Sequence, residues 1–232
     1  MNNIQNNIQK IKKQIAECEA RYQRKPFSVS LLAVSKTQPV EKILAAVQAG
    51  QIAFGENYLQ ESLEKITALA NENIEWHFIG SIQRNKTKKI AEHFAWVHTI
   101  DDIKIAKRLN EQRPSHLPPL NICLQINSSF EATKSGTDPQ NILSLAKDCT
   151  LLPRLKLRGL MTIPAPKKTF AEQRAELHKL RLIYEMLNTH GFGLDTLSMG
   201  MSDDMEAAIA EGATMVRIGT AIFGKRLPNI IP

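Results

Sequence analysis

Eight short apolar stretches rich in β-branched residues recur along the 232-residue chain, and the stretches between them have apolar residues at helical spacing. Apolar runs of this kind predict strands, and strands that alternate with helices predict parallel pairing through right-handed crossovers. The predicted strands are residues 30–35, 52–55, 75–79, 96–100, 120–126, 157–163, 195–199 and 214–218. Eight such units in a chain of this length favour a single (β/α)8 TIM-type barrel over an open doubly wound sheet.

Both ends of the chain depart from this repeat. The residues after Gly224 are too few and too rich in proline to form an ordinary closing helix. Before the first predicted strand, four isoleucines at helical spacing mark an extra amphipathic N-terminal helix. They are Ile4, Ile8, Ile11 and Ile15. We expect this helix to take the place beside the barrel that a closing helix would occupy, and we expect residues 1–232 to form one domain.

Charge and composition exclude several classes of partner. The net charge of +7 is compatible with nucleic-acid binding, but the basic residues are scattered over different predicted segments without an aromatic stacking motif. We interpret them as solvated helix faces that would also favour an anionic small ligand. The three cysteines have no framework or metal-ligand spacing, which indicates a reducing compartment and no metal. With no leader-like segment and no apolar run near ~20 residues, we expect a cytoplasmic protein without membrane contact.

A lysine closes the first predicted strand, and an Arg-x-Gly-Thr sequence closes the last one. Lys36 ends the run that starts at Leu31, and Arg217 precedes Gly219 and Thr220. A half-buried amine loses its proton more easily than a solvated one, so Lys36 suits Schiff-base chemistry. Backbone N–H groups and a hydroxyl at Gly219 and Thr220 suit a phosphate. Since barrels carry their chemistry at the carboxyl ends of the strands, the sequence predicts a site for a phosphorylated aldehyde, of which pyridoxal phosphate is the obvious one.

Further polar residues follow the predicted strands. Ser198 lies at the end of the seventh predicted strand and Ser202 follows it, in the region that commonly holds phosphate in such barrels. Asp203 and Asp204 come next; they suit a helix N-terminus but have to point away from a bound phosphate. His77 ends the third strand, where we leave two interpretations open, a hydrogen-bonded residue of the barrel rim or a ligand.

Two other features of the sequence do not require a binding role. Lys134 lies in a glycine-containing loop and is interpreted as solvated, with contact to the ligand as the alternative. Met161, Met199 and Met201 are interpreted as packing residues.

Seven segments that run in order over nearly the whole chain match those of a known family of barrel proteins. They are AVSKT (33–37), FGENYLQE (54–61), WHFIGSIQRNK (76–86), KSG (134–136), RGLMTI (158–163), LSMGMSDDMEAAI (197–209) and VRIGTAIFG (216–224). On these segments the chain resembles the pyridoxal phosphate homeostasis proteins, single-domain relatives of the alanine racemase barrel. It departs from them at Ser81-Ile82, where many relatives read Pro-Leu.

The resemblance implies a role for each candidate residue. Lys36 would hold pyridoxal phosphate as a Schiff base, Arg217 would face the pyridine nitrogen, and Asn57 would lie beside the ring. The implied phosphate ligands are Ser198, Ser202, Gly219 and Thr220. Because a guanidinium is effectively never deprotonated, Arg217 can only donate to the ring nitrogen and keeps it unprotonated. Such a ring is a poorer electron sink than a pyridinium, which disfavours transamination and decarboxylation.

Three functional classes compete. The first is a protein that stores, buffers or delivers pyridoxal phosphate, with dependent apo-enzymes as recipients and without substantial turnover. The second is an amino-acid racemase, which needs two acid/base groups on opposite faces of the bound substrate. Alanine racemases take the second group, a tyrosine, from a β-domain of the partner subunit. We expect no such domain here, and Tyr58 is the one tyrosine near the predicted rim.

The third class is a Schiff-base aldolase, which requires a carboxylate or tyrosine pair near the lysine, and no clear pair is present. We therefore favour the first class, a cofactor-binding protein rather than an enzyme. Since the racemase-type dimer domain is missing, we also expect a monomer.

Overall fold

The computed structural model describes residues 2–127 and 135–224. Its helices and strands are α1 (Asn2–Arg21), β1 (Ser30–Val34), α2 (Val40–Gln48), β2 (Ala53–Glu56), α3 (Leu59–Ala68), β3 (Glu75–Phe78), η1 (Arg84–Lys86), α4 (Thr87–His93), β4 (Trp96–Ile100), α5 (Ile103–Gln112), β5 (Leu120–Gln125), η2 (Pro139–Asn141), α6 (Ile142–Thr150), β6 (Leu155–Met161), α7 (Phe170–Thr189), β7 (Thr196–Ser198), α8 (Met205–Ala210), β8 (Met215–Ile218) and α9 (Thr220–Phe223).

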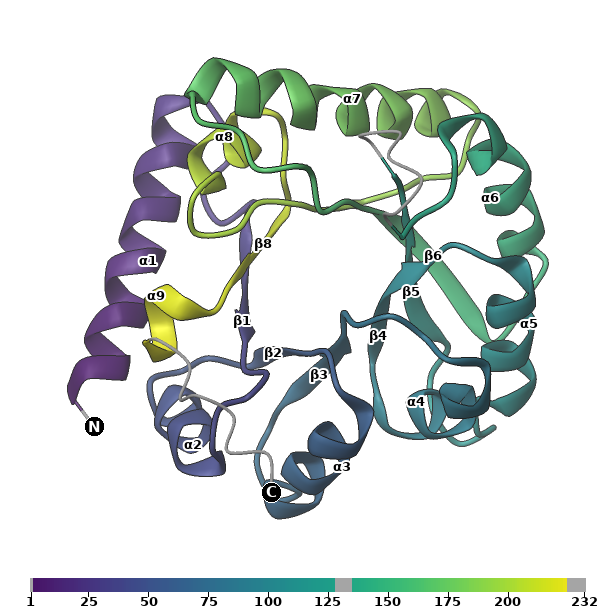
Figure 1. Ribbon diagram of the computed structural model, residues 1–232, viewed down its shortest axis with the longest axis horizontal. Helices are drawn as coiled ribbons and strands as arrows, with labels where there is room; N and C mark the ends of the chain where they lie inside the picture. Colours follow the sequence, from purple (N-terminus) through teal and green to yellow (C-terminus); the bar gives the residue numbers. More distant parts are fainter. Residues whose placement is uncertain (1, 128–134, 225–232) are drawn as a thin grey trace.

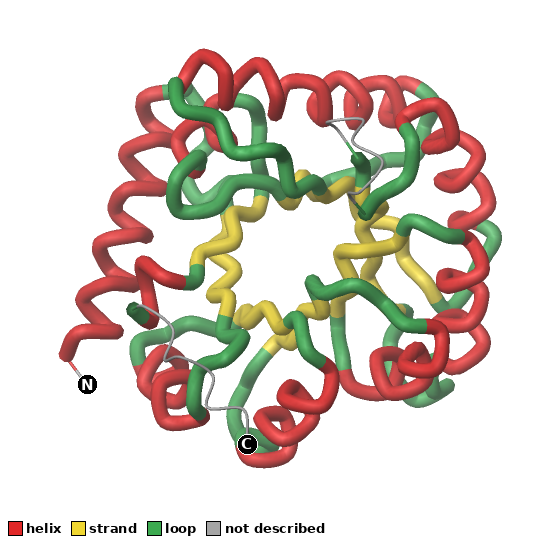
Figure 2. The backbone as a smooth tube through the Cα atoms, in the orientation of Figure 1, coloured by secondary structure: helices red, strands yellow, loops and turns green. Residues whose placement is uncertain are grey.

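In the described part of the chain, eight parallel strands close a barrel in sequence order. Strand β1 closes it by pairing with β8, where Leu32 lies opposite Arg217. The ring of strands lies inside a ring of helices (Figure 1), and the connecting loops run between the two layers (Figure 2). The predicted (β/α)8 barrel is therefore confirmed.

Several element boundaries follow from local sequence signals. Helix α7 starts with a capping box, in which Thr169 and Glu172 are bonded to each other's backbone N–H groups. Asp102 caps α5 by accepting a hydrogen bond from the backbone N–H of Lys104 at 2.8 Å. Strand β6 starts two residues earlier than expected, because Leu155 pairs with the first residue of β5.

The N-terminal helix fills the gap left by the short helix after β8. Helix α9 has only four residues, and α1 packs against α8, α9 and α2 along the outside of β1 and β8 (Figure 1). Ile8, Ile11 and Ile15 are buried on its inner face. Asn7 adds a hydrogen bond from its side-chain amide to the carbonyl of Ile222 at 2.9 Å. This placement is the one predicted from the isoleucine spacing.

The described helices and cysteines have the following properties. None of the helices within residues 2–127 and 135–224 has the length and apolar character that crossing a bilayer requires. Over the same residues, no group of histidine, cysteine and acidic side chains is arranged to hold a metal ion. The three cysteines of the chain are buried and free.

Candidate functional site

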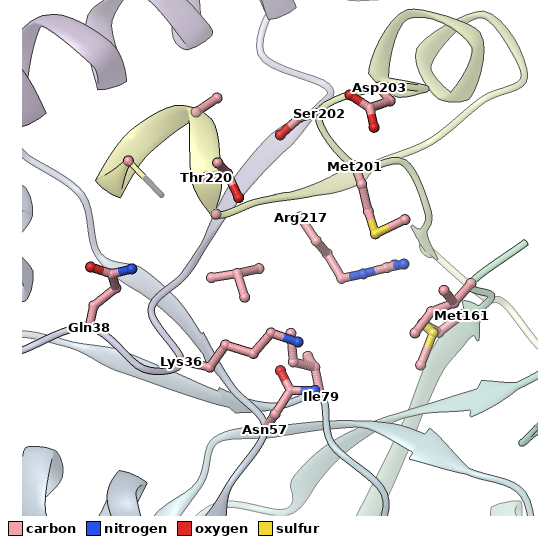
Figure 3. Close-up of a pocket in the computed structure, with 15 residues that line it drawn as sticks. Lys36, Gln38, Asn57, Ile79, Met161, Met201, Ser202, Asp203, Arg217 and Thr220 are labelled. Carbon is pink, nitrogen blue, oxygen red and sulfur yellow. The ribbon is translucent and has the colours of Figure 1, made fainter. Parts of the chain in front are cut away.

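A pocket of about 500 Å³ lies at the carboxyl ends of the barrel strands, and most of the predicted site residues line it (Figure 3). Its described lining consists of Val34, Lys36, Gln38, Asn57, Ile79, Met161, Ile163, Met201, Ser202, Asp203, Arg217, Gly219, Thr220, Ala221 and Gly224. Every predicted cofactor-binding residue except Ser198 is in this set. The structure thus brings together residues that lie up to 184 positions apart, from Lys36 to Thr220.

The backbone around Lys36 is held on both sides. The N–H of Ser35 donates to the carbonyl of Gly55 at 3.0 Å, and the N–H of Thr37 donates to the Glu61 carboxylate at 2.5 Å. Thr37 adopts φ = 61°, a left-handed conformation that is uncommon for a β-branched residue. The lysine is therefore fixed at a sharp turn, and its side chain extends into the pocket toward Asn57 and Ile79 (Figure 3).

A buried ion cluster lies behind this turn. The Lys65 ammonium donates to Glu56 at 2.8 Å, to Glu61 at 2.5 Å and to the carbonyl of Ser35 at 2.7 Å. The Ser35 hydroxyl also donates to Glu56 at 2.6 Å. Burial raises the pKa of Glu56, and the Lys65 charge opposes that rise. Lys65 was not among the residues predicted from the sequence; the signal that points to it is its spacing of four from Glu61 within the predicted helix.

Arg217 is buried at the wall of the pocket and held by carbonyl groups. One terminal nitrogen donates to the carbonyl of Ser198 at 2.5 Å and to its hydroxyl at 3.0 Å. The other donates to the carbonyl of Thr162 at 2.8 Å. These bonds use three of the five N–H groups, so within the described residues Arg217 keeps donors for a ligand acceptor. Burial lowers the pKa of Arg217 to about 10, which still leaves it cationic at neutral pH.

Ser198 lies inside the barrel, next to the pocket. It is the last residue of β7, is fully buried, and is absent from the described pocket lining. Its hydroxyl accepts from Arg217 and lies 2.9 Å from Nδ1 of His98. In the described residues this hydroxyl thus supports Arg217, and the phosphate contact expected from the sequence stays a prediction.

The other predicted phosphate residues do lie at the pocket. Ser202 is exposed in the loop after β7, and Gly219 and Thr220 follow β8. A Cβ atom at Gly219 would lie 3.1 Å from the carbonyl oxygen of Val34, so a larger residue would crowd the neighbouring strand end. Gly200 has φ = 94°, and a Cβ there would lie 2.5 Å from that of Ala208. The loop geometry therefore depends on glycine at the start of the turn.

The two aspartates after Ser202 behave differently. Asp204 turns back and accepts from the backbone N–H of Met201 at 2.6 Å, and burial raises its pKa. Asp203 is exposed and lines the pocket beside Ser202 (Figure 3). Asp203 thus lies at the pocket, and the expectation that it points away from a bound phosphate stays a prediction. Met201 also lines the pocket, because it sits on the same exposed loop rather than in the core.

Two histidines inside the barrel change the interpretation of His77. His77 is fully buried, with Nε2 2.9 Å from Glu75 and Nδ1 2.9 Å from Nε2 of His98. It is neither a rim residue nor part of the pocket lining. His98 was not among the residues predicted from the sequence, although His77 and His98 occupy inward positions on neighbouring strands. Lys134 lies outside the described residues.

The site and fold define a class of protein: a (β/α)8 barrel with a lysine at the end of β1 and an Arg-x-Gly-Thr sequence at the end of β8. The family model described as alanine racemase, N-terminal domain, matches residues 1–227. The pyridoxal phosphate homeostasis proteins of Pseudomonas aeruginosa and Escherichia coli K12 are 56% and 51% identical to the chain. The first alignment covers 97% of both chains; the second covers 97% of this chain and 98% of the other.

Solved structures agree with this assignment. PipY of Synechococcus elongatus, in a structure with pyridoxal phosphate bound, is 37% identical with a TM-score of 0.79 over 90% of this chain and 100% of that one. An alanine racemase from Corynebacterium glutamicum shares the fold, with a TM-score of 0.74 at 17% identity over 99% of this chain and 63% of that one. The chain therefore belongs to the pyridoxal phosphate homeostasis protein family.

Proposed function

We propose that this chain binds pyridoxal phosphate through the amine of Lys36 and acts in the storage, buffering or delivery of that cofactor. The observation that carries the proposal is the convergence of Lys36 and Arg217 in one pocket whose far side is formed by Ser202 and Thr220 (Figure 3). Gly219 also lines this pocket. An amine, a buried cation and a hydroxyl-lined loop match the aldehyde, the pyridine nitrogen and the phosphate of this cofactor.

Further features of the pocket fit the same group. Ile79 and Met161 give it apolar walls suited to an aromatic ring. The side-chain oxygen of Asn57 is buried and has no hydrogen-bond partner in the described residues, so a ligand donor could satisfy it. When bound, the cofactor would supply an aldehyde that forms a Schiff base with an amine. The chain would orient the ring with Arg217 and Asn57 and anchor the phosphate with Ser202, Gly219 and Thr220.

The same residues argue against substantial turnover. Lys36, Asp203 and Arg217 are the ionisable side chains among the described lining residues, and Asp203 lies beyond Ser202, on the side of the pocket far from Lys36 (Figure 3). Tyr58 is 55% exposed and does not line the described pocket. A second acid/base group opposite Lys36 is therefore missing from the described lining. Arg217 can only donate a hydrogen bond, which keeps a ring nitrogen unprotonated and weakens it as an electron sink.

Relatives support this function. Proteins at 51% and 56% identity carry the name pyridoxal phosphate homeostasis protein, and PipY binds pyridoxal phosphate in its solved structure. We further propose that residues 1–232 form one domain that acts as a monomer in the cytoplasm and passes the cofactor to dependent apo-enzymes. Three buried, free thiols fit a reducing compartment.

Two assays on the cofactor-loaded protein test the function. The first measures reactivation of an apo-enzyme that requires pyridoxal phosphate, and the second measures deuterium incorporation at Cα across a panel of L- and D-amino acids. We expect reactivation together with exchange far below ordinary turnover, since loss of one acid/base group costs about 10²–10⁴ in rate. Exchange at about 1 s⁻¹ or faster would instead establish a racemase. Lys36→Arg is the negative control, and exposed Lys86→Arg is the matched one.

A further inference from the structure

A continuous chain of hydrogen bonds crosses the interior of the barrel from Arg217 to Glu75. The hydroxyl of Ser198 lies 3.0 Å from Arg217 and 2.9 Å from Nδ1 of His98. Nε2 of His98 lies 2.9 Å from Nδ1 of His77, whose Nε2 lies 2.9 Å from the Glu75 carboxylate. The chain links strands β8, β7, β4 and β3 and leads from the pocket to the opposite end of the barrel, where Glu75 starts β3.

The Glu75 carboxylate and the burial of both histidines fix the direction of every bond in this hydrogen-bond chain. As an ionised carboxylate Glu75 can only accept, so His77 carries a proton on Nε2 and donates to it. Because burial keeps both imidazoles neutral, Nδ1 of His77 is an acceptor, and His98 carries its proton on Nε2 and donates to it. Nδ1 of His98 is then an acceptor as well, so the Ser198 hydroxyl donates to it while accepting from Arg217. Both histidines are therefore the Nε2–H tautomer.

The surroundings of the histidines favour this neutral arrangement. Both side chains are fully buried, and burial lowers the pKa of each. The Trp96 ring stacks on His77 with centroids 5.3 Å apart and planes 6° from parallel. Charged neighbours lie outside this stack: Arg158 covers Trp96 at 4.6 Å and pairs with Asp195 at 2.8 Å.

Glu75 is the residue of this hydrogen-bond chain that reaches solvent. Its side chain is 45% exposed, while that of His77 is not exposed at all. The hydrogen bond to His77 lowers the pKa of Glu75, so the Glu75 carboxylate is ionised at neutral pH. The Glu75 carboxylate, which orients the hydrogen-bond chain as its terminal acceptor, thus lies at the opposite end of the barrel from the pocket.

We propose that His98 is a positioning residue for Arg217, acting through the Ser198 hydroxyl, with the orientation of its ring imposed by His77 and Glu75. If His98 did not accept from Ser198, that hydroxyl would lack its buried acceptor and could no longer be held toward Arg217. The effect on a ligand rests on the proposed function, in which Arg217 donates to the ring nitrogen. The tautomers of the two histidines do not depend on it.

The tautomers provide the first test, on the protein without added ligand. Nitrogen-15 NMR of histidine-labelled protein distinguishes protonated from unprotonated ring nitrogens, and His77→Gln and His98→Asn variants assign the signals. We expect both residues to be neutral at pH 7, with the proton on Nε2. A proton on Nδ1 of either ring, or a cationic ring, would overturn the proposal whether or not the protein binds pyridoxal phosphate.

Binding measurements on variants provide the second test. In His98→Asn, the short amide keeps an acceptor near the Nδ1 position, whereas His98→Phe keeps the ring shape and removes the acceptor. We expect Phe to raise the dissociation constant of pyridoxal phosphate by about threefold to tenfold, the loss of roughly one hydrogen bond, and to shift the absorption of the bound cofactor. Asn should stay near the parent protein, as should exposed His116→Asn.

A double-mutant cycle separates positioning from general loosening of the barrel. If His98 acts through the Ser198 hydroxyl, His98→Phe should change the dissociation constant little in a Ser198→Ala background. Additive effects, or a folded His98→Phe variant with unchanged affinity and spectrum, would refute the role of His98. If Phe prevents folding, the proposal stands or falls on the tautomers and on His98→Asn, which has to retain both the parent affinity and the parent spectrum. A parent protein that binds no pyridoxal phosphate would refute the proposed function, and the NMR result alone would then decide the hydrogen-bond directions.

Discussion

Replacing Lys65 by methionine should lower the free energy of unfolding, because the turn around Lys36 rests on the buried ion cluster that Lys65 forms. The Lys65 side chain is 5% exposed and that of Glu56 is not exposed at all, so the substitution leaves a buried carboxylate without its cation. Breaking a buried pair in this way costs about 3–5 kcal/mol. We expect urea unfolding to show a loss of that size in the free energy of unfolding. The carbonyl of Ser35, beside Lys36, loses its donor as well.

The pH dependence of this loss has a defined sign. Burial already raises the pKa of Glu56, and the Lys65→Met substitution removes the positive charge and the hydrogen bond that oppose this rise. A carboxyl whose folded pKa is raised contributes stability below its unfolded pKa of about 4.3, and that contribution is lost as the pH rises through the folded value. The variant should therefore be closest to the parent protein near pH 4 and fall further behind toward pH 7.

A second substitution provides the control. Glu56→Gln removes the charge that methionine leaves unpaired, so the double variant Lys65→Met, Glu56→Gln should recover part of the lost stability and show a weaker pH dependence. Exposed Lys86→Met is the matched single control. A Lys65→Met variant that loses less than about 1 kcal/mol, or one whose deficit shrinks as the pH rises, would refute this account of the cluster.

Three further substitutions address the pocket. Arg217→Met removes the guanidinium donor from the carbonyl groups of Ser198 and Thr162, of which the first keeps the N–H of Thr162 at 3.4 Å, and should cost roughly 1–3 kcal/mol in total in urea unfolding; an unchanged midpoint would contradict the buried role of the arginine. Asp203→Asn removes a carboxylate beside the phosphate loop and should tighten pyridoxal phosphate binding about two- to fivefold at low salt, by titration; weaker binding would contradict this placement. Gly200→Ala places a Cβ 2.5 Å from that of Ala208 at φ = 94° and should lower stability by about 1–3 kcal/mol, whereas a neutral result in thermal unfolding would show that the turn relaxes.

The barrel could be predicted from the sequence because its signals are local and repeated. Eight apolar runs set the strand number, and the isoleucines of α1 showed which helix completes the outer ring. Lys36 and Arg217 could be found for a related reason, since both belong to strand ends and the fold class places strand ends in one layer.

Side-chain direction was the part that the sequence did not decide. Ser198 and His77 each lie at or near the end of a strand, but their side chains point into the barrel, where they form hydrogen bonds with His98 instead of lining the pocket. Whether the end residue of a strand faces the interior or the loops depends on the register and tilt of the closed barrel. Lys65 was missed because a lysine on a predicted helix is ordinarily solvated.

Sodium borohydride reduction followed by peptide mass spectrometry tests the central claim most directly. Treatment of the protein loaded with pyridoxal phosphate should fix a pyridoxyl group on the peptide that contains Lys36, because this lysine extends into the pocket beside Asn57. Lys36→Arg should abolish the label at that position, and Lys86→Arg should leave it unchanged. Absence of any pyridoxyl adduct, or labelling mainly at Lys134 or another lysine, would contradict the assignment of Lys36 as the cofactor-binding residue.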